Sequence, residues 1–374
     1  MNNLAFRQWI NRSKVPRILV SGNDQLVQQR VMERILHRLF QSNSTVIVYD
    51  HTSIGIDLQG TGFSIQDGLC GRFFHYDPFQ AVDGDLKALS RLRQIVSVLN
   101  LSSEDKLPIY FQLLQKMESL RTGIQTPLTL EAFQSNQAAF LFEERLDALS
   151  LSERERKLFR SIYYEVCQAA AEFGHAMLLL APMTIGTEPL PSQNHSLLLY
   201  RMDSFRGDPC LQRLVGLLLR FALEDFTAPA AVVVLDDGCE AAFPMAEMIS
   251  CLPRSMELYY VTEDVFAAEE SALRCLKGAF SAEIFSRHTS MESCQAIEKR
   301  FGTIPVRHST YTVHYDRRWK ANSPWDVFLG NNKSEDYGAA APMEEPRYRK
   351  EDIMSFPAGT VLLKCGGDSM ITAV

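Results

Sequence analysis

The 374-residue chain is long enough for one large domain or two ordinary ones, each with a substantial hydrophobic core. Its 46% apolar and 22% charged residues are ordinary for a globular protein, which disfavours a disordered or fibrous class. The net charge of −7 argues against wrapping of nucleic acid by the whole surface, although it leaves room for a local basic patch.

The cysteines and the apolar runs indicate which further classes of protein are not expected. The eight cysteines stand singly and form no CxxC pair, so neither a disulfide framework nor a metal site is expected. The longest apolar runs, 176–183 and 214–219, are too short to cross a bilayer. The first residues lack the apolar stretch of a signal peptide. We therefore expect a cytoplasmic chain without a membrane span of its own.

Residues 1–84 carry alternating strand and helix signals. Apolar runs at 17–20 and 45–49 flank a segment in which apolar residues recur at the helical period. Glycines punctuate residues 54–78, which predicts a hairpin and a further strand. This part is expected to be the N-terminal half of an α/β core.

Residues 85–177 change to helix formers with almost no strand signal. Asp or Ser caps and a Thr126-Pro127 break separate the helical patterns. The predicted helices span 86–99, 104–121, 129–149 and 152–173. This composition predicts an all-helical domain inserted into the α/β core.

Strand and helix signals alternate again over residues 178–320, the expected C-terminal half of the core with a β-arm. The predicted strands cover 176–181, 197–203, 230–235, 256–262 and 281–286. The predicted helices cover 208–226, 240–252, 264–278 and 290–301. Continuous apolar strands separated by helices indicate a mostly parallel sheet with helices on both faces. Residues 321–374 are expected to be a loose segment, 321–346, and a closing C-terminal strand.

The stretch after the first strand has the order of a nucleotide-binding P-loop without its ligands. In G-x-x-x-x-G-K-[ST] the backbone amides surround phosphates, the lysine contacts them and the hydroxyl holds Mg²⁺. Aligned on Gly22, this template places Val27 at the second glycine, Gln28 at the lysine and Gln29 at the hydroxyl. Asp24 adds a negative charge where phosphates would lie. The residues of such a vestigial nucleotide site are Gly22, Asn23, Gln28, Gln29 and Arg30.

Two later strands end in acidic residues at positions that matter for ATP chemistry. Asp236 follows an apolar strand, as a magnesium-binding acid would, and Asp237 is one methylene shorter than the glutamate usual for activating water. Glu263 follows the next strand, where its charge would repel a γ-phosphate by a few kcal/mol, on the order of an ion pair at close range. A buried strand ending in an acidic loop is also common without any catalytic role. No catalytic residue is therefore expected, and these three acids are interpreted as vestigial.

The order of these features and the tail of the chain resemble a known family. Residues 345–353 (EPRYRKEDI) and 356–363 (FPAGTVLL) look like the C-terminal motif of conjugative coupling ATPases of the TraG/TraD kind, within the FtsK/HerA group. The segment 291–302, a helix ending in glycine, fits as well. The resemblance implies a RecA-like core with an inserted all-α domain. The P-loop lysine and hydroxyl, the second acid, the sensor glutamine and the family's N-terminal membrane helices are replaced or absent.

This resemblance with altered ligands predicts a non-hydrolysing subunit of a conjugative or type IV-like secretion machinery that acts through protein–protein contacts. The implied partners are an active coupling ATPase or another secretion-system subunit, or a relaxase or substrate protein. A partner of this kind would hold the chain at the inner face of the membrane. No cofactor is expected. ATP with Mg²⁺ belongs to the alternative of a divergent ATPase rebuilt with Arg30, Arg34 or an arginine from a neighbouring subunit.

Residues 306–320, VRHSTYTVHYDRRWK, favour a second alternative, a nucleic-acid-binding module. They alternate with a period of two and interleave basic with aromatic residues, which suits contacts to phosphates and bases. The expected contacts are Arg307, Arg317, Arg318 and Lys320. An exposed β-arm whose charges prevent edge pairing would show the same pattern.

Overall fold

The computed structural model describes two compact units, which are treated separately below. The first comprises residues 1–286 with 358–374, and the second comprises residues 287–357. The residues that the structure describes are 16–42, 45–52, 62–67, 77–79, 85–101, 104–123, 139–179, 195–202, 209–225, 230–236, 252–253, 255–267, 273, 278–306, 309–315, 333–339 and 343–374.

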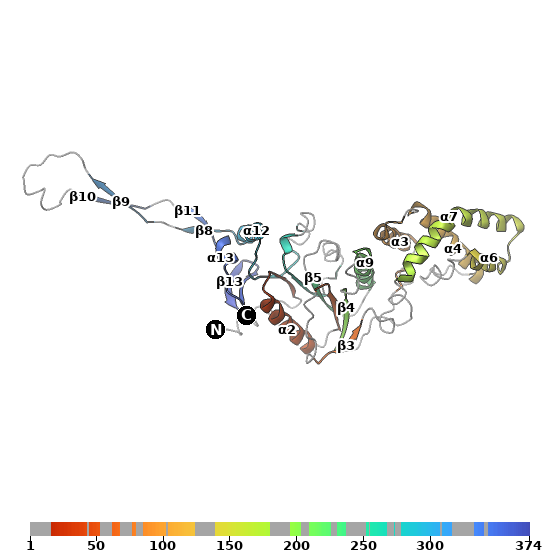
Figure 1. The fold of residues 1–374 in the computed structure, drawn as a ribbon, viewed down its shortest axis with the longest axis horizontal. Helices are drawn as coiled ribbons and strands as arrows, with labels where there is room; N and C mark the ends of the chain where they lie inside the picture. The colour runs from red at the N-terminus through yellow and green to blue at the C-terminus, as the bar shows by residue number, and fades with distance from the viewer. Residues whose placement is uncertain are drawn as a thin grey trace, which may run out of the picture. The chain divides into compact units, whose positions relative to one another are not determined.

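A nine-stranded sheet forms the centre of the first unit, in the order β13-β12-β7-β1-β6-β5-β2-β4-β3 (Figure 1). Every neighbouring pair from β7 to β3 is parallel, whereas β12 runs antiparallel to β7 and β13 antiparallel to β12. The strands are β1 (Arg17–Ser21), β2 (Thr45–Asp50), β3 (Ser64–Asp67), β4 (Ser196–Arg201), β5 (Ala230–Asp236), β6 (Glu257–Thr262), β7 (Ala282–Phe285), β12 (Thr360–Cys365) and β13 (Asp368–Ala373). The predicted mostly parallel sheet is confirmed.

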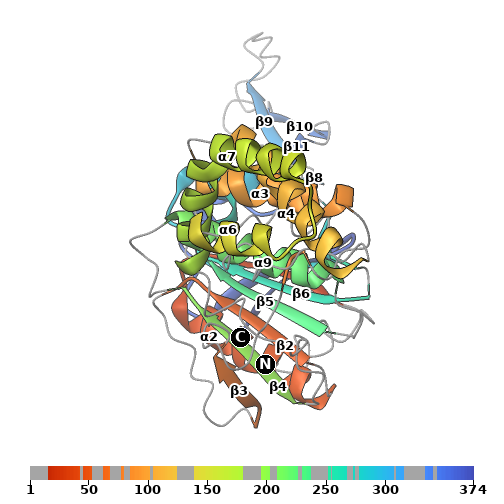
Figure 2. The ribbon, with the colours of Figure 1, turned by 90° about the vertical axis from the view of Figure 1, so that its right-hand side faces the viewer.

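Helices cover both faces of this sheet. α2 (Gln25–Gln41) buries Val27, Val31 and Ile35 against alternate residues of the strands, which include Val20 and Val48. The helical period of these side chains is what predicted the segment from sequence. α9 (Pro209–Asp225) lies on the opposite face (Figure 2). The prediction of helices on both faces is confirmed.

The helical segment consists of α3 (Asp85–Leu99), η1 (Glu104–Lys106), α4 (Leu107–Thr122), α6 (Ala139–Asp147) and α7 (Glu153–Leu179). The rings of Phe142 in α6 and Tyr163 in α7 stack with centroids 3.9 Å apart. The run 176–179, predicted to open a strand, instead continues α7. This prediction was wrong because a short apolar run is compatible with a helix as well as with a strand.

The second unit contains α12 (Met291–Phe301), β8 (Thr303–Val306), β9 (Ser309–Tyr315), β10 (Lys333–Ala339), β11 (Met343–Pro346) and α13 (Lys350–Met354). Ser290 caps α12 by accepting a hydrogen bond from the Ser293 amide, and Gly302 ends it with φ at +74°. β8 pairs antiparallel with β11, and β9 with β10. The segment expected to be loose therefore contains two strands. Local composition did not reveal them because their partners are distant in sequence.

A second strand also follows the predicted closing strand. β12 and β13 form a hairpin through Gly366 and Gly367, and Gly366 has φ at +59°. Paired glycines suit such a two-residue turn because they adopt positive φ without strain.

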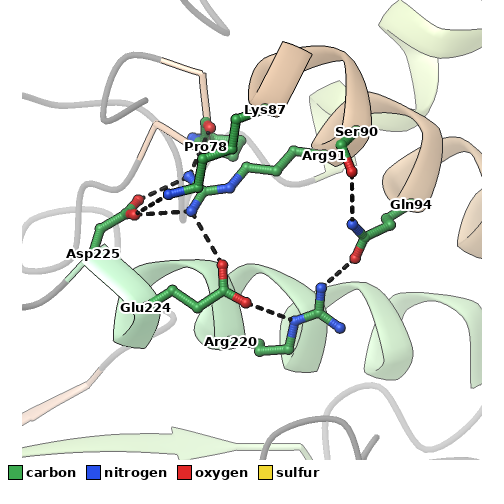
Figure 3. A network of polar contacts seen from close by, with 8 residues as sticks. All are labelled: Pro78, Lys87, Ser90, Arg91, Gln94, Arg220, Glu224 and Asp225. Atoms are coloured by element: carbon green, nitrogen blue, oxygen red, sulfur yellow. Dashed lines mark hydrogen bonds and ion pairs between the residues drawn. The ribbon is translucent and has the colours of Figure 1, made fainter. Parts of the chain in front are cut away.

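A buried charge network joins α3 to the C-terminal end of α9 (Figure 3). The guanidinium of Arg91, 2% exposed, donates to both carboxylate oxygens of Asp225 at 2.8 and 2.9 Å. It also donates to the Pro78 carbonyl oxygen at 3.0 Å. Glu224 lies between Arg91 and Arg220, 3.4 Å from each. The network ties the helical segment to the helix that leads into β5, so both belong to one compact unit.

We expect Arg91→Ala to lower the free energy of unfolding by about 2–4 kcal/mol, because it removes a buried side chain and takes a cation from the partly buried carboxylates of Asp225 and Glu224. Urea unfolding followed by circular dichroism measures this loss. Lys87→Ala is the matched control, since Lys87 pairs with the same Asp225 at 3.3 Å but has a half-exposed side chain. It should cost less than about 1 kcal/mol. Equal losses in the two variants would show that the network does not hold α3 in place.

Candidate functional site

The carboxyl ends of β1, β6 and β5 lie side by side at one edge of the sheet. Ser21 is in register with Thr262, and Thr262 is in register with Asp236. The predicted elements of the nucleotide site therefore share this edge, because Gly22 follows β1 and Glu263 follows β6. In open α/β sheets this edge is where ligands usually bind.

The connection from β1 to α2 is a tight turn made of Gly22, Asn23 and Asp24. α2 begins at Gln25, so the three template positions from Val27 to Gln29 lie within the helix. Asp24 is the N-cap, and its Oδ1 accepts hydrogen bonds from the amides of Leu26 at 3.0 Å and Val27 at 3.3 Å. An aspartate just before an apolar-periodic segment is a signal for such a cap.

The predicted nucleotide-binding residues divide into two groups in the structure. Gln28 lies in α2 but is buried, and its side-chain Nε2 donates to the carbonyl oxygen of Gly22 at 2.9 Å. Its side chain therefore contacts the turn that Gly22 and Asn23 form. Gln29 and Arg30 are exposed on α2. The Arg30 guanidinium donates to the main-chain oxygen of Val374. The residue at the lysine position thus closes the turn with a neutral side chain.

The backbone on either side of Gly22 is fixed by neighbouring strands. Its amide donates to the Thr262 carbonyl oxygen at 3.1 Å, and the Ser286 amide donates to the Ser21 carbonyl oxygen at 2.9 Å. Gly22 has φ at +144°, and a Cβ there would lie 2.0 Å from the Ser286 Oγ and 3.0 Å from its carbonyl carbon. Only glycine fits this position. Sequence reasoning missed Ser286, because no local pattern marks a residue that a distant strand brings to the turn.

Asp236 lies at the end of β5 and accepts a hydrogen bond through Oδ2 from the Tyr260 hydroxyl at 2.9 Å. Burial raises the pKa of Tyr260 well above its usual value, and the charge of Asp236 adds to this shift. Burial and then Asp236 raise the pKa of Tyr49 in the same way. Asp237 lies outside the described residues, and Glu263 is half-buried after β6. Asp236, the vestigial acid at the position of a magnesium ligand, is therefore engaged by a protonated tyrosine.

Tyr260 was not predicted to belong to the site. Strand alternation places it on the same face of β6 as Thr262, which pairs with Asp236. That alternation was visible in the sequence, but it does not say which neighbouring strand carries the partner. The register between β5 and β6 supplies this information.

The structure describes only part of the predicted nucleic-acid-binding arm. Arg307, Arg317, Arg318 and Lys320 lie outside the described residues, which show β9 and β10 as a paired backbone. In the part of the chain that the structure describes, no cluster of His, Cys, Asp or Glu side chains could hold a metal ion. Within the same residues, no helix combines the length and the apolar character needed to cross a bilayer.

Known structures resemble the whole chain, although no family model and no curated protein sequence matches it. The unbound conjugative coupling protein TrwB superposes with a TM-score of 0.58 at 12% identity, over 96% of this chain and 84% of that one. TrwB in complex with ADP and Mg²⁺ gives 0.55 at 12%, over 99% and 91%. VirB4 of Thermoanaerobacter pseudethanolicus gives 0.52 at 12%, over 96% and 89%.

The chain has a RecA-like α/β fold. This confirms the predicted fold class, and a conjugative coupling protein is among the structures that share it. At 12% identity the RecA-like fold is what the likeness shows, because a fold hosts many chemistries. The chemistry of the present chain has to be inferred from the turn after β1 and from Asp236.

We expect Gly22→Ala to lower the free energy of unfolding by about 2–4 kcal/mol, because the new Cβ meets Ser286 and the residue must keep a positive φ. Chemical denaturation measures the change. Gly367→Ala is the control, since nothing lies within 4 Å of a Cβ built there. A Gly22→Ala protein as stable as this control would contradict the close approach of β7 to the turn.

Buried tyrosines predict a loss of stability at alkaline pH. The pKa values of Tyr49, Tyr259 and Tyr260 are raised chiefly by burial, so the folded state keeps protons that the unfolded chain releases above about pH 10. The stabilising effect is complete below that pH. Above it, the free energy of unfolding should fall by about 1.4 kcal/mol per pH unit for each such tyrosine.

Urea unfolding at a series of pH values tests this slope. Tyr260→Phe should make the decline shallower by one tyrosine's share, and should cost about 1–3 kcal/mol at neutral pH because Asp236 loses a buried donor. Tyr164→Phe removes an exposed tyrosine and should leave both quantities unchanged. An alkaline slope that is the same in all three proteins would contradict the assignment.

Proposed function

We propose that the chain is a coupling-protein-like subunit of a conjugative or type IV-like secretion machinery, that it does not hydrolyse ATP, and that it acts through protein–protein contacts. The observation that carries this proposal is the turn between β1 and α2. α2 begins at Gln25, and Gln28, at the lysine position, directs its amide to the Gly22 carbonyl oxygen. A turn built in this way offers neither the extended amide-lined loop nor the cation on which phosphoryl transfer depends.

The environment of Asp236 supports the same proposal. A magnesium-holding acid presents its oxygens to the ion or to its water shell. Here Oδ2 of Asp236 accepts the Tyr260 hydroxyl in a buried setting. The likeness to TrwB, which has been solved with ADP and Mg²⁺, suggests that the ancestral site occupied this edge of the sheet. The fold is then kept, whereas the residues that bind nucleotide and magnesium are replaced.

The secretion role rests on the fold shared with TrwB and VirB4 and on the tail resembling the coupling family. We propose an active coupling ATPase or another subunit of the machinery as the partner, with a relaxase or substrate protein as a further one. A RecA-like subunit can keep the surfaces that it uses toward its neighbours without a working nucleotide site. Such a partner would also hold the chain at the inner face of the membrane. No cofactor is required for this role.

Isothermal titration of ATP with Mg²⁺ into the purified chain, combined with a long-incubation phosphate-release assay, tests the proposal. We expect no binding heat and no release above a buffer blank, and we expect Asp236→Ala to change neither. Hydrolysis that Asp236→Ala abolishes would instead establish the divergent ATPase. Salt-dependent DNA binding that is lost in an Arg317→Ala, Arg318→Ala double variant would establish the nucleic-acid-binding module.

A further inference from the structure

The carboxylate of Asp24 contacts two segments that lie far apart in the sequence. Oδ1 accepts the amides of Leu26 and Val27 in the first turn of α2. Oδ2 accepts the amide of Gly359 at 2.8 Å, in a buried position. Asp24 itself is 8% exposed. Both oxygens of a buried negative charge are thus used by backbone donors, as the burial of a charge requires.

The segment held by Asp24 is the start of the C-terminal hairpin. Gly359 has φ at +80°, and its carbonyl oxygen accepts the Val374 amide at 2.8 Å. Arg30, further along α2, donates to the main-chain oxygen of the same Val374. α2 therefore contacts both ends of the hairpin formed by β12 and β13, through an anion at its N-cap and a cation in its second turn.

These contacts occur at the place where a nucleotide-binding protein holds phosphate. The free amides and the dipole at a helix N-terminus attract an anion, and in P-loop proteins that anion is the nucleotide. In this chain the first amides of α2 already bind a carboxylate that belongs to the turn itself. The second oxygen of that carboxylate then fixes Gly359 beside the turn.

We propose that Asp24 is a built-in anion that takes the place of phosphate at the N-terminus of α2 and fastens the start of the hairpin 360–373 beside it. This inference rests on the proposed loss of ATP chemistry and deepens it by naming what occupies the site. The site is occupied from within the chain. α2 keeps its anion preference and satisfies it intramolecularly.

Two variants separate the charge of Asp24 from its size. Asp24→Gly removes the anion and allows a free anion to approach the α2 amides. Asp24→Asn keeps the size, but its amide nitrogen cannot accept the Gly359 amide, so it remains informative if the glycine variant does not fold. Glu33→Gln is the matched control, because it removes one carboxylate from an exposed position on the same helix.

Hydrogen–deuterium exchange of residues 358–374 and thermal unfolding are measured for each protein in sodium chloride and in sodium phosphate at equal ionic strength. We expect exchange at Gly359 and Val374 to be about tenfold faster or more in both Asp24 variants and unchanged in Glu33→Gln. Phosphate should slow this exchange and raise the melting temperature of Asp24→Gly beyond the general salt effect seen in Glu33→Gln.

Wild-type exchange rates in both Asp24 variants would overturn the proposal. A phosphate effect in Asp24→Gly no larger than in Glu33→Gln would also overturn it, because the carboxylate would then not stand in for a phosphate anion. ATP hydrolysis by the wild-type chain would overturn the proposed function instead. The two failures are distinguishable, because one is read from exchange and melting of variants and the other from turnover of the unmodified chain.

Discussion

Pairing of β1 with β6 on one side and β7 on the other is the constraint on which the candidate site depends. It fixes the backbone where β1 ends, aligns Ser21 with Thr262, and brings Ser286 against Gly22. The chain can leave this position only through a residue without a side chain. Once Gly22 has turned, α2 begins almost at once, and its N-terminus faces the edge of the sheet at which β5 ends.

Three buried charges in the described part of the first unit contact groups from another element. Arg91 of α3 meets Asp225 of α9, Asp236 of β5 meets the hydroxyl of Tyr260 in β6, and Asp24 meets the amide of Gly359. An unpaired charge would be expensive in such surroundings, so each pairing specifies which elements pack together. One of these pairings engages Asp236, which lies at the position of the magnesium-binding acid of an ATPase.

How far the sequence predicts the structure can be followed element by element. The period of apolar residues predicted α2 and α3 because each buries a single stripe, whereas α9 is buried on all sides from 214 to 223. Residues 176–179 were misassigned, because a short apolar run is compatible with a helix as well as with a strand. β10 and β13 were missed because segments of mixed composition form strands only when they pair with a neighbouring strand, here β9 and β12. The aspartate cap at Asp24 was readable as a helix start, whereas its second contact, to Gly359, was not.

By itself the sequence determined the α/β class, the inserted helices, the glycine after β1 and the absence of a lysine and a hydroxyl from the P-loop positions, because these depend on local period and residue identity. Tertiary structure alone decided that Gln28 turns back to Gly22, that Tyr260 engages Asp236, and that Asp24 binds the C-terminal hairpin. The contact of Tyr260 with Asp236 depends on strand order and register, and that of Asp24 with Gly359 brings together segments 335 residues apart. Local sequence carries no record of that closeness, because it arises only when the sheet assembles and its buried polar groups must find partners.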